Sequence, residues 1–208
     1  MTEANNPYEC IGVHEHIFKA VESLVASGAF QGKKILDVGA GYQDKEKWCA
    51  AVGSKYWLGD LYKGLDVTTM DIRPECECMV TGDAENLYEL FPDAKFDVAF
   101  SFETLEHCLI PQNVISQIWL VLMPGGVLFI STPQAQPHHT PRHLWLFTEV
   151  GIRYLLLVNG FQVLKQVPLG GTPGREWSWL TIAQKVTPED LEGEAKVSSE
   201  LKSLESPG

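Results

Sequence analysis

The 208-residue sequence has no long hydrophobic run and no basic residue near its start. Its apolar stretches, such as 119–123 and 154–158, fall far short of the roughly 18 residues that a membrane-spanning helix needs. The first ten residues include acids but no base, which is not typical of a secretory signal. We therefore expect a cytoplasmic protein without a membrane partner.

Basic residues and cysteines are also scarce. Lysine and arginine number 16 against 27 aspartates and glutamates, which gives a net charge of −11. This excess of negative charge disfavours binding along the phosphate backbone of a nucleic acid. The five cysteines are scattered and odd in number, which favours a reduced protein over a disulfide framework. No further ligand pair at matching spacing accompanies Cys76 and Cys78, so we expect no metal site.

The length fits one domain, and 45% apolar with 21% charged residues is a globular balance. The segment 187–208 holds six acids and two lysines and has few large apolar residues. Such a composition does not support a packed core. We therefore expect an N-terminal arm over 1–10, a single domain over 11–186 and an acidic, disordered tail over 187–208.

Helical spacing of apolar residues alternates with short apolar runs along the chain. Helical patterns cover 17–25, about 43–61, 114–122 and 148–159. Runs typical of strands cover 34–38, 67–70, 78–81, 96–101, 127–131, 161–167 and 177–183. This alternation predicts an α/β fold: a doubly wound, Rossmann-like, mostly parallel seven-stranded sheet with an antiparallel last strand and helices on both faces. Ligands of such sheets bind beyond the carboxyl ends of the strands.

A glycine turn follows the first predicted strand in the run ILDVGAG. Gly39 and Gly41 let a ligand approach the backbone, and the next helix points free N–H groups toward it. Asp37 adds a carboxylate nearby. The dinucleotide fingerprint G-x-G-x-x-G needs a glycine at position 44, where this chain has Asp44. Two acids here match a cofactor with ammonium and sulfonium groups better than one with two phosphates.

Acids also end the next two predicted strands. Asp71 is placed to accept hydrogen bonds from ribose hydroxyls, with Ile72 beside it, whereas Asp66 lies nearer the usual spacing of about 20 residues after the glycines. We favour Asp71 because a strand leads directly into it. Asp83 can accept from an exocyclic amine, and the N–H of Ala84 can donate to a ring nitrogen. Three successive acidic strand ends thus indicate an adenosine site.

These segments together resemble the class I S-adenosylmethionine-dependent methyltransferases, in particular the small-molecule group called type 11. The resemblance is carried by ILDVGAG, VTTMDI, GDAENL, FDVAFSFETLEH and LMPGGVLFISTP, over residues 35–133. It implies S-adenosyl-L-methionine as the cofactor. It also implies cofactor contacts from Asp37, Gly39, Ala40 and Gly41 to the methionine part, from Asp71 to the ribose, from Asp83 and Ala84 to the adenine, and from Ser101 and Phe102 beside it.

Methyl transfer from a sulfonium requires an aligned nucleophile and the exclusion of water, and a general base helps when a hydroxyl is methylated. His107 follows the fourth predicted strand and is our candidate base, since imidazole exchanges a proton near neutral pH. A structural role beside Cys108 is the alternative. The proline-containing segment 132–146 is expected to cover the ligand edge. Predicted acceptor contacts are Glu103, His138, His139, Arg142, His143 and Trp145.

The resemblance implies methyl transfer to a small-molecule acceptor, with oxygen favoured over nitrogen or carbon. DNA amino-methyltransferases have an Asn/Asp-Pro-Pro-aromatic motif where this chain reads SFETLEH, so we expect no nucleic-acid partner. One alternative is a nicotinamide-dependent reductase or epimerase, which Asp44 and the lack of a Tyr-x-x-x-Lys pair disfavour. Another is a non-catalytic S-adenosylmethionine-binding partner subunit. The oligomeric state stays open.

Overall fold

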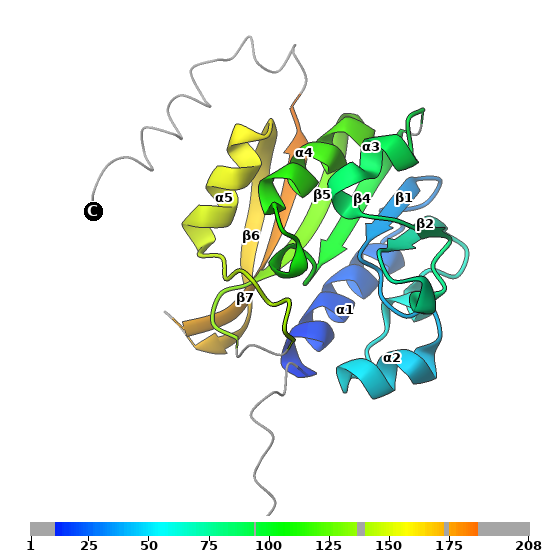
Figure 1. Cartoon of the computed structure of the whole chain (residues 1–208), viewed down its shortest axis with the longest axis vertical. Helices are drawn as coiled ribbons and strands as arrows, with labels where there is room; N and C mark the ends of the chain where they lie inside the picture. Colours follow the sequence, from blue (N-terminus) through cyan, green and yellow to red (C-terminus); the bar gives the residue numbers. More distant parts are fainter. Residues whose placement is uncertain (1–10, 94, 137–139, 173–174, 187–208) are drawn as a thin grey trace, which may run out of the picture.

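Seven strands form one sheet in the computed structural model, which describes residues 11–93, 95–136, 140–172 and 175–186 (Figure 1). The strands are β1 (Lys34–Val38), β2 (Asp66–Asp71), β3 (Val80–Thr81), β4 (Phe96–Phe102), β5 (Leu122–Pro133), β6 (Phe161–Thr172) and β7 (Arg175–Lys185). Their order is β3-β2-β1-β4-β5-β7-β6. Only the pairs that include β7 are antiparallel, which confirms the predicted sheet. The predicted arm and tail lie outside the described residues.

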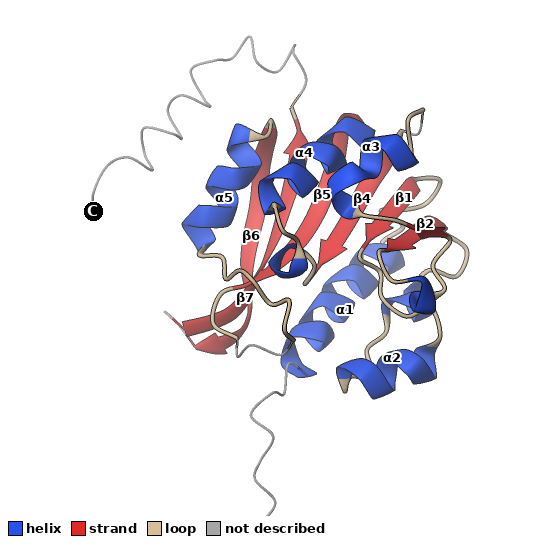
Figure 2. Ribbon diagram, in the orientation of Figure 1, coloured by secondary structure: helices blue, strands red, loops and turns tan. Residues whose placement is uncertain are grey.

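Helices cover both faces of the sheet, as predicted (Figure 2). The helices are α1 (Ile11–Ala26), α2 (Lys45–Val52), α3 (Leu87–Leu90), α4 (Pro111–Val121) and α5 (Glu149–Val158). Ile17 of α1 packs into one core cluster with Phe100, whereas Ile118 of α4 and Leu156 of α5 pack into another with Leu36. No helix in the described part of the chain has the combined length and apolarity that crossing a membrane requires.

The helix predicted around 43–61 is wrong in its extent. α2 ends at Val52 because Gly53 adopts the left-handed conformation, with φ of 71°, and its N–H donates to the carbonyl of Cys49. A separate short 3₁₀ turn, η1, covers Leu58–Leu61. None of the residues of α2 is buried, so α2 lies at the margin of the fold rather than on the sheet.

The third predicted strand, 78–81, is also shorter than expected. β3 contains only Val80 and Thr81, because a 3₁₀ turn at Pro74–Cys76 and Glu77, with φ of 58°, occupy the approach to it. Cys76 is buried, and the four described cysteines are free thiols. β1 and β4 are neighbours at the point where the strand order reverses, and ligands of such sheets bind beyond the carboxyl ends of the strands at this point.

Candidate active site

The glycine turn after β1 is tied to the ends of two neighbouring strands. The N–H groups of Gly39 and Ala40 both donate to the carbonyl oxygen of Met70 in β2, at 2.9 Å. Gly39 has a φ of 74°, and a Cβ atom there would overlap the Thr104 side chain, which follows β4. The turn therefore needs glycine both for its backbone conformation and for the close approach of the segment after β4.

β2 separates the two candidate ribose ligands by its full length. Asp66 begins the strand opposite Lys34, at the amino end of β1, whereas Asp71 ends it. Asp71 is only 4% exposed, and its Oδ2 accepts from the Gly41 N–H at 3.0 Å. The N–H of Gly82 donates to the Asp71 carbonyl, which brings the Asp83 loop to the same edge. Only Asp71 therefore shares an edge with the glycine turn.

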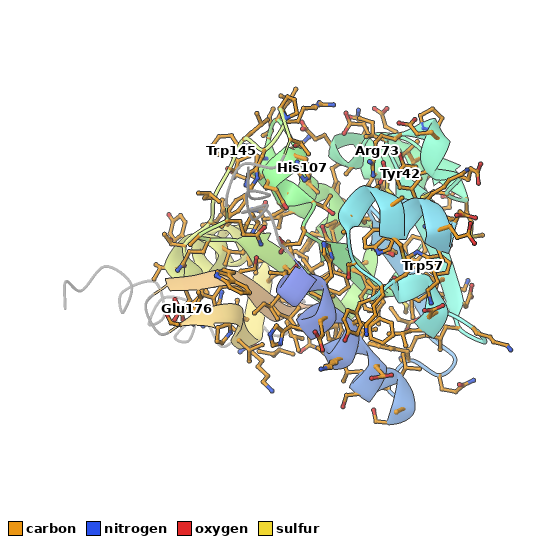
Figure 3. The ribbon with its side chains drawn as sticks, turned by 90° about the horizontal axis from the view of Figure 1, so that it is seen from below. Tyr42, Trp57, Arg73, His107, Trp145 and Glu176 are labelled. Carbon is orange, nitrogen blue, oxygen red and sulfur yellow. The ribbon has the colours of Figure 1, made fainter. Side chains whose placement is uncertain are left out.

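An arginine that the sequence reasoning missed covers Asp71. The backbone N–H and Nε of Arg73 both donate to Asp71 Oδ1 at 3.0 Å, and its Nη2 donates to Oδ2 at 3.2 Å. The guanidinium lies 5.4 Å from the centre of the Tyr42 ring. Figure 3, which views the sheet from the side of the β4 carboxyl end, shows Arg73 and Tyr42 together. A ribose that binds Asp71 must therefore share the carboxylate with Arg73 or displace it.

Asp37 is held by a second residue that sequence reasoning missed. Its side chain is buried on β1, and its Oδ2 accepts from the Tyr62 hydroxyl at 2.6 Å. Burial raises the pKa of Asp37 to about 7, the hydrogen bond from Tyr62 opposes this rise, and the charge of Asp71 adds to it. A positive group beside Asp37 would restore its ionised form. Tyr62 lies 25 positions away, so no local motif pointed to it.

The remaining predicted cofactor residues differ in accessibility. Asp83 begins a 3₁₀ turn and accepts from the Glu85 N–H at 2.9 Å, and Ala84 beside it is buried. Ile72 is 47% exposed, so a ligand can reach it. Two residues at the end of β4 are less open: Ser101 is completely buried, and Phe102 stacks on Phe100.

Two glutamates that follow β4 have carboxyl oxygens inaccessible to solvent. Glu103 has a φ of 48°, unusual outside glycine, and its Oε2 accepts from Gln136 Nε2 at 2.9 Å and from the Ser178 hydroxyl at 3.3 Å. Burial raises its pKa to about 7. Glu106, which the sequence reasoning missed, is 0% exposed, and burial together with the charge of Glu103 raises its pKa well above the usual value. Burial thus raises the pKa of both carboxyls.

His107 ends the short 3₁₀ turn that carries Glu106. Its Nδ1 lies 3.1 Å from the Arg142 carbonyl oxygen, which can only accept, so Nδ1 carries the proton in this hydrogen bond. Its Nε2 lies 3.7 Å from Glu106 Oε1, and its ring centre lies 5.9 Å from that of the buried His143. Within the described ranges, no three His, Cys, Asp or Glu side chains form a group that could hold a metal ion.

The segment 140–147 covers this turn. The Leu144 N–H donates to the Glu106 carbonyl at 2.7 Å, and Trp145 Nε1 donates to the Cys108 carbonyl at 2.9 Å. Figure 3 shows Trp145 and His107 on one side of the edge and Arg73 with Tyr42 on the other. Arg142 is exposed and contacts His107 through its carbonyl. The predicted acceptor residues His138 and His139 lie outside the described residues.

Residues 12–166 match a family model described as a methyltransferase domain. The ubiquinone biosynthesis O-methyltransferase of Photorhabdus laumondii subsp. laumondii is 30% identical over 161 residues, which cover 71% of this chain and 57% of that relative. The chain spans little more than half the length of this relative and of a second ubiquinone biosynthesis O-methyltransferase, from Colwellia psychrerythraea.

Solved structures agree in fold. Magnesium protoporphyrin IX methyltransferase from Synechocystis PCC 6803, crystallised with S-adenosylhomocysteine, superposes with a TM-score of 0.62 at 17% identity, covering 89% of this chain and 90% of that one. The 1,6-didemethyltoxoflavin-N1-methyltransferase of Burkholderia thailandensis gives 0.60 at 19% identity, with 82% and 78% covered. The match over residues 12–166 establishes the family, and the chain belongs to the class I S-adenosylmethionine-dependent methyltransferases.

Proposed function

We propose that this chain uses S-adenosyl-L-methionine to methylate a hydroxyl group of a small molecule. The observation that carries the proposal is the meeting of four strand ends, those of β1, β2, β3 and β4, at one edge. Backbone hydrogen bonds join the Gly39 turn to β2 and the Asp83 loop to Asp71, and Thr104 brings the segment after β4 against Gly39. Relatives named as O-methyltransferases support oxygen as the acceptor atom.

The residues at this edge fit the cofactor, which supplies an activated methyl group on a positively charged sulfur. The bare backbone of Gly39 and Gly41 leaves room for the methionine part. Asp37 provides a buried negative partner for its ammonium group. Asp71 binds the ribose hydroxyls once Arg73 turns away, and Asp83 with the Ala84 N–H holds the adenine. The exposed Ile72 covers the face of the adenine ring.

The same geometry disfavours a nicotinamide dinucleotide. Asp44 caps α2, where its Oδ1 accepts from the Lys47 N–H at 2.8 Å. The helix start that a pyrophosphate would use therefore already holds a carboxylate. A negatively charged ligand there would be repelled by Asp44 and would compete with it for the same N–H groups.

His107 is the proposed general base. With its proton on Nδ1, the neutral ring presents the lone pair of Nε2 to an acceptor hydroxyl. The imidazolium formed by proton transfer lies 3.7 Å from Glu106 Oε1, and its positive charge favours ionisation of this carboxyl against the burial and the Glu103 charge that raise its pKa. The segment 140–147 excludes water from this side of the site. The predicted contacts from Arg142, His143 and Trp145 lie on this cover, and those from His138 and His139 remain predictions.

Calorimetry with S-adenosylmethionine, S-adenosylhomocysteine and NAD tests the cofactor assignment. We expect S-adenosylmethionine and S-adenosylhomocysteine to bind and NAD to give no binding signal, because only the first two match the acidic residues at this edge of the sheet. Tight NAD binding without a response to the others would refute the proposal. Incubation with a panel of small hydroxyl and amine compounds then tests transfer. Cofactor binding without methylation of any of them would favour the non-catalytic partner subunit.

A further inference from the structure

Three carboxylate oxygens of the segment after β4 have no hydrogen-bond partner among the described residues. They are Oε1 of Glu103 and both oxygens of Glu106, and all three are inaccessible to solvent. Glu103 and Glu106 lie three positions apart after β4, and the charge of Glu103 contributes to the raised pKa of Glu106. Buried carboxylates in proteins are normally saturated by donors, because an unpaired one is costly.

By contrast, the carboxylate of Asp97 has a hydrogen-bond donor for each of its oxygens. Asp97 accepts from the Lys34 backbone N–H at 2.9 Å with one oxygen and from Lys33 Nζ at 3.2 Å with the other. By comparison, no lysine or arginine in the described part of the chain forms an ion pair with Glu103 or Glu106. His107 Nε2 lies 3.7 Å from Glu106 Oε1 and carries a charge only when protonated, so in the described part of the chain the pair has no permanently charged cationic partner.

Glu103, one member of the pair, has a strained backbone conformation. Glu103 keeps its positive φ because its N–H donates to the carbonyl oxygen of Ser131 at 3.2 Å and to the hydroxyl at 3.0 Å. Strained non-glycine residues of this kind concentrate at ligand sites, where the fold supports a geometry that the ligand needs. Glu103 also directly precedes Thr104, which packs over the Gly39 turn, so the pair adjoins the proposed cofactor site.

We propose that the Glu103–Glu106 pair is the acceptor-recognition site and binds the ammonium group of an amine-bearing small molecule. An ammonium has three N–H donors and one positive charge, which match three unpartnered oxygens on two carboxyls. The net charge of −11 also favours the approach of a cationic acceptor. This inference rests on the proposed methyl transfer and specifies its substrate class: a hydroxyl compound that carries a protonated amine.

Entry of the amine requires the cover to shift. The Leu144 N–H and Trp145 Nε1 hold the segment 140–147 onto the turn that carries Glu106, through hydrogen bonds to the carbonyls of Glu106 and Cys108. Trp145 is 44% exposed, so its ring can swing outward without opening the core.

Three phenols of the same shape test the proposal: cationic tyramine, neutral 4-ethylphenol and anionic 4-hydroxyphenylacetate. Calorimetry with saturating S-adenosylhomocysteine gives the affinity of each for the full chain. We expect tyramine to bind at least about tenfold more tightly than 4-ethylphenol, and 4-hydroxyphenylacetate to bind most weakly. Glu106→Gln should reduce the tyramine preference to about twofold or less, since it removes the charge at nearly constant shape.

Glu103→Gln provides a second variant, and Glu89→Gln, an exposed acid on α3, is the matched control that should keep the full preference. S-adenosylhomocysteine affinity verifies that each variant is folded. Lack of a tyramine preference in the wild type, including lack of any binding, would overturn the proposal, as would a preference that survives in both site variants. Stoichiometric Mn²⁺ binding that Glu106→Gln abolishes would show that the pair holds a metal instead. Failure of S-adenosylhomocysteine to bind the wild type would refute the proposed function itself.

Discussion

The two halves of the ligand edge are built in different ways. In the cofactor half, at the ends of β1, β2 and β3, the acids are held by partners: Asp37 by Tyr62 and Asp71 by Arg73. After β4, in the proposed acceptor half, Glu103 and Glu106 have carboxyl oxygens without a hydrogen-bond partner among the described residues. The acids of the first half are thus already held in place, whereas we propose that those of the second half receive their partner from the acceptor.

The largest loss of cofactor affinity is expected from a substitution in the glycine turn after β1. Gly39→Val should lower cofactor affinity by about 100-fold or more, because the residue must hold a positive φ and its side chain would overlap Thr104. Gly53→Val is the matched control, since Gly53 has a φ of 71° and open space around it. Both variants should lose about 1–3 kcal/mol of folding stability, but only the first should lose binding. Equal losses of affinity, measured by calorimetry, would contradict the account.

Replacing His107, the proposed general base, should affect catalysis but not cofactor binding. His107→Ala should lower kcat by about 100-fold or more, the usual scale for general-base catalysis, while cofactor affinity stays the same. Steady-state kinetics and calorimetry separate the two effects. His16→Ala, an exposed histidine on α1, should change neither. If kcat survives in His107→Ala, alignment alone drives the transfer and His107 is structural.

Asp71 and Asp66 test which end of β2 serves the cofactor. Asp71→Ala should weaken cofactor binding by about 10- to 100-fold, because hydrogen bonds to a charged group are worth about 1.5–3 kcal/mol. Asp66→Ala, at the far end of the strand, should leave it unchanged. The opposite ranking in calorimetry would show that the ribose lies elsewhere.

The pKa of Asp37, raised to about 7 by burial, predicts a pH dependence of the cofactor half. The cofactor ammonium binds the ionised carboxylate, so affinity should rise with pH up to about 7 and then level off, by at most about tenfold per unit. Folding has the opposite dependence. Native Asp37 holds its proton to a higher pH than the unfolded chain, so its stabilising contribution is full below about pH 4 and is lost toward pH 7.

Asp37→Asn isolates this effect. The variant should bind the cofactor more weakly and with a flatter pH profile, and its unfolding free energy should fall less between about pH 4 and pH 7. Calorimetry and denaturant titration at several pH values measure both. A profile that matches the wild type would assign the titration to another group, with the buried Glu103 as the first candidate.

The smallest effect is expected at Arg73. Arg73→Ala frees Asp71 from an ion pair that the ribose has to share or displace, so we expect about two- to fivefold tighter cofactor binding. The effect is limited because the Arg73 side chain is half exposed and its ion pair is screened by solvent. Weaker binding in the variant, measured by calorimetry, would mean that Arg73 contacts the cofactor itself.

The sequence predicted the sheet well, and its cofactor candidates lie at one edge of that sheet, because both features depend on short-range patterns; the binding roles of these residues stay predictions. Buried runs and the glycines of ILDVGAG encode strands and a turn locally, and parallel strands bring their ends together. The error at 43–61 arose because the left-handed Gly53 ends α2 early.

Glu106 and the hydrogen-bond partners of Glu103 escaped prediction because their contacts join distant segments. Glu103 contacts Gln136 and Ser178, 33 and 75 positions away, and the carbonyl of the buried Glu106 accepts from the N–H of the distant Leu144. In the sequence, Glu106 is an acid in a loop, and nothing marks it as buried. The partners Tyr62 and Arg73 were missed for a related reason, since a pattern of acids does not show which side chain covers them.

A crystal structure of the chain with S-adenosylhomocysteine would show whether the strand ends at this edge bind the cofactor together. We expect the adenosine to lie between Asp71 and the Asp83 loop, with Arg73 displaced or sharing the Asp71 carboxylate. We expect the sulfur to point toward the segment after β4. A nucleoside bound in another hollow, with the Arg73–Asp71 pair intact and the glycine turn empty, would contradict this arrangement.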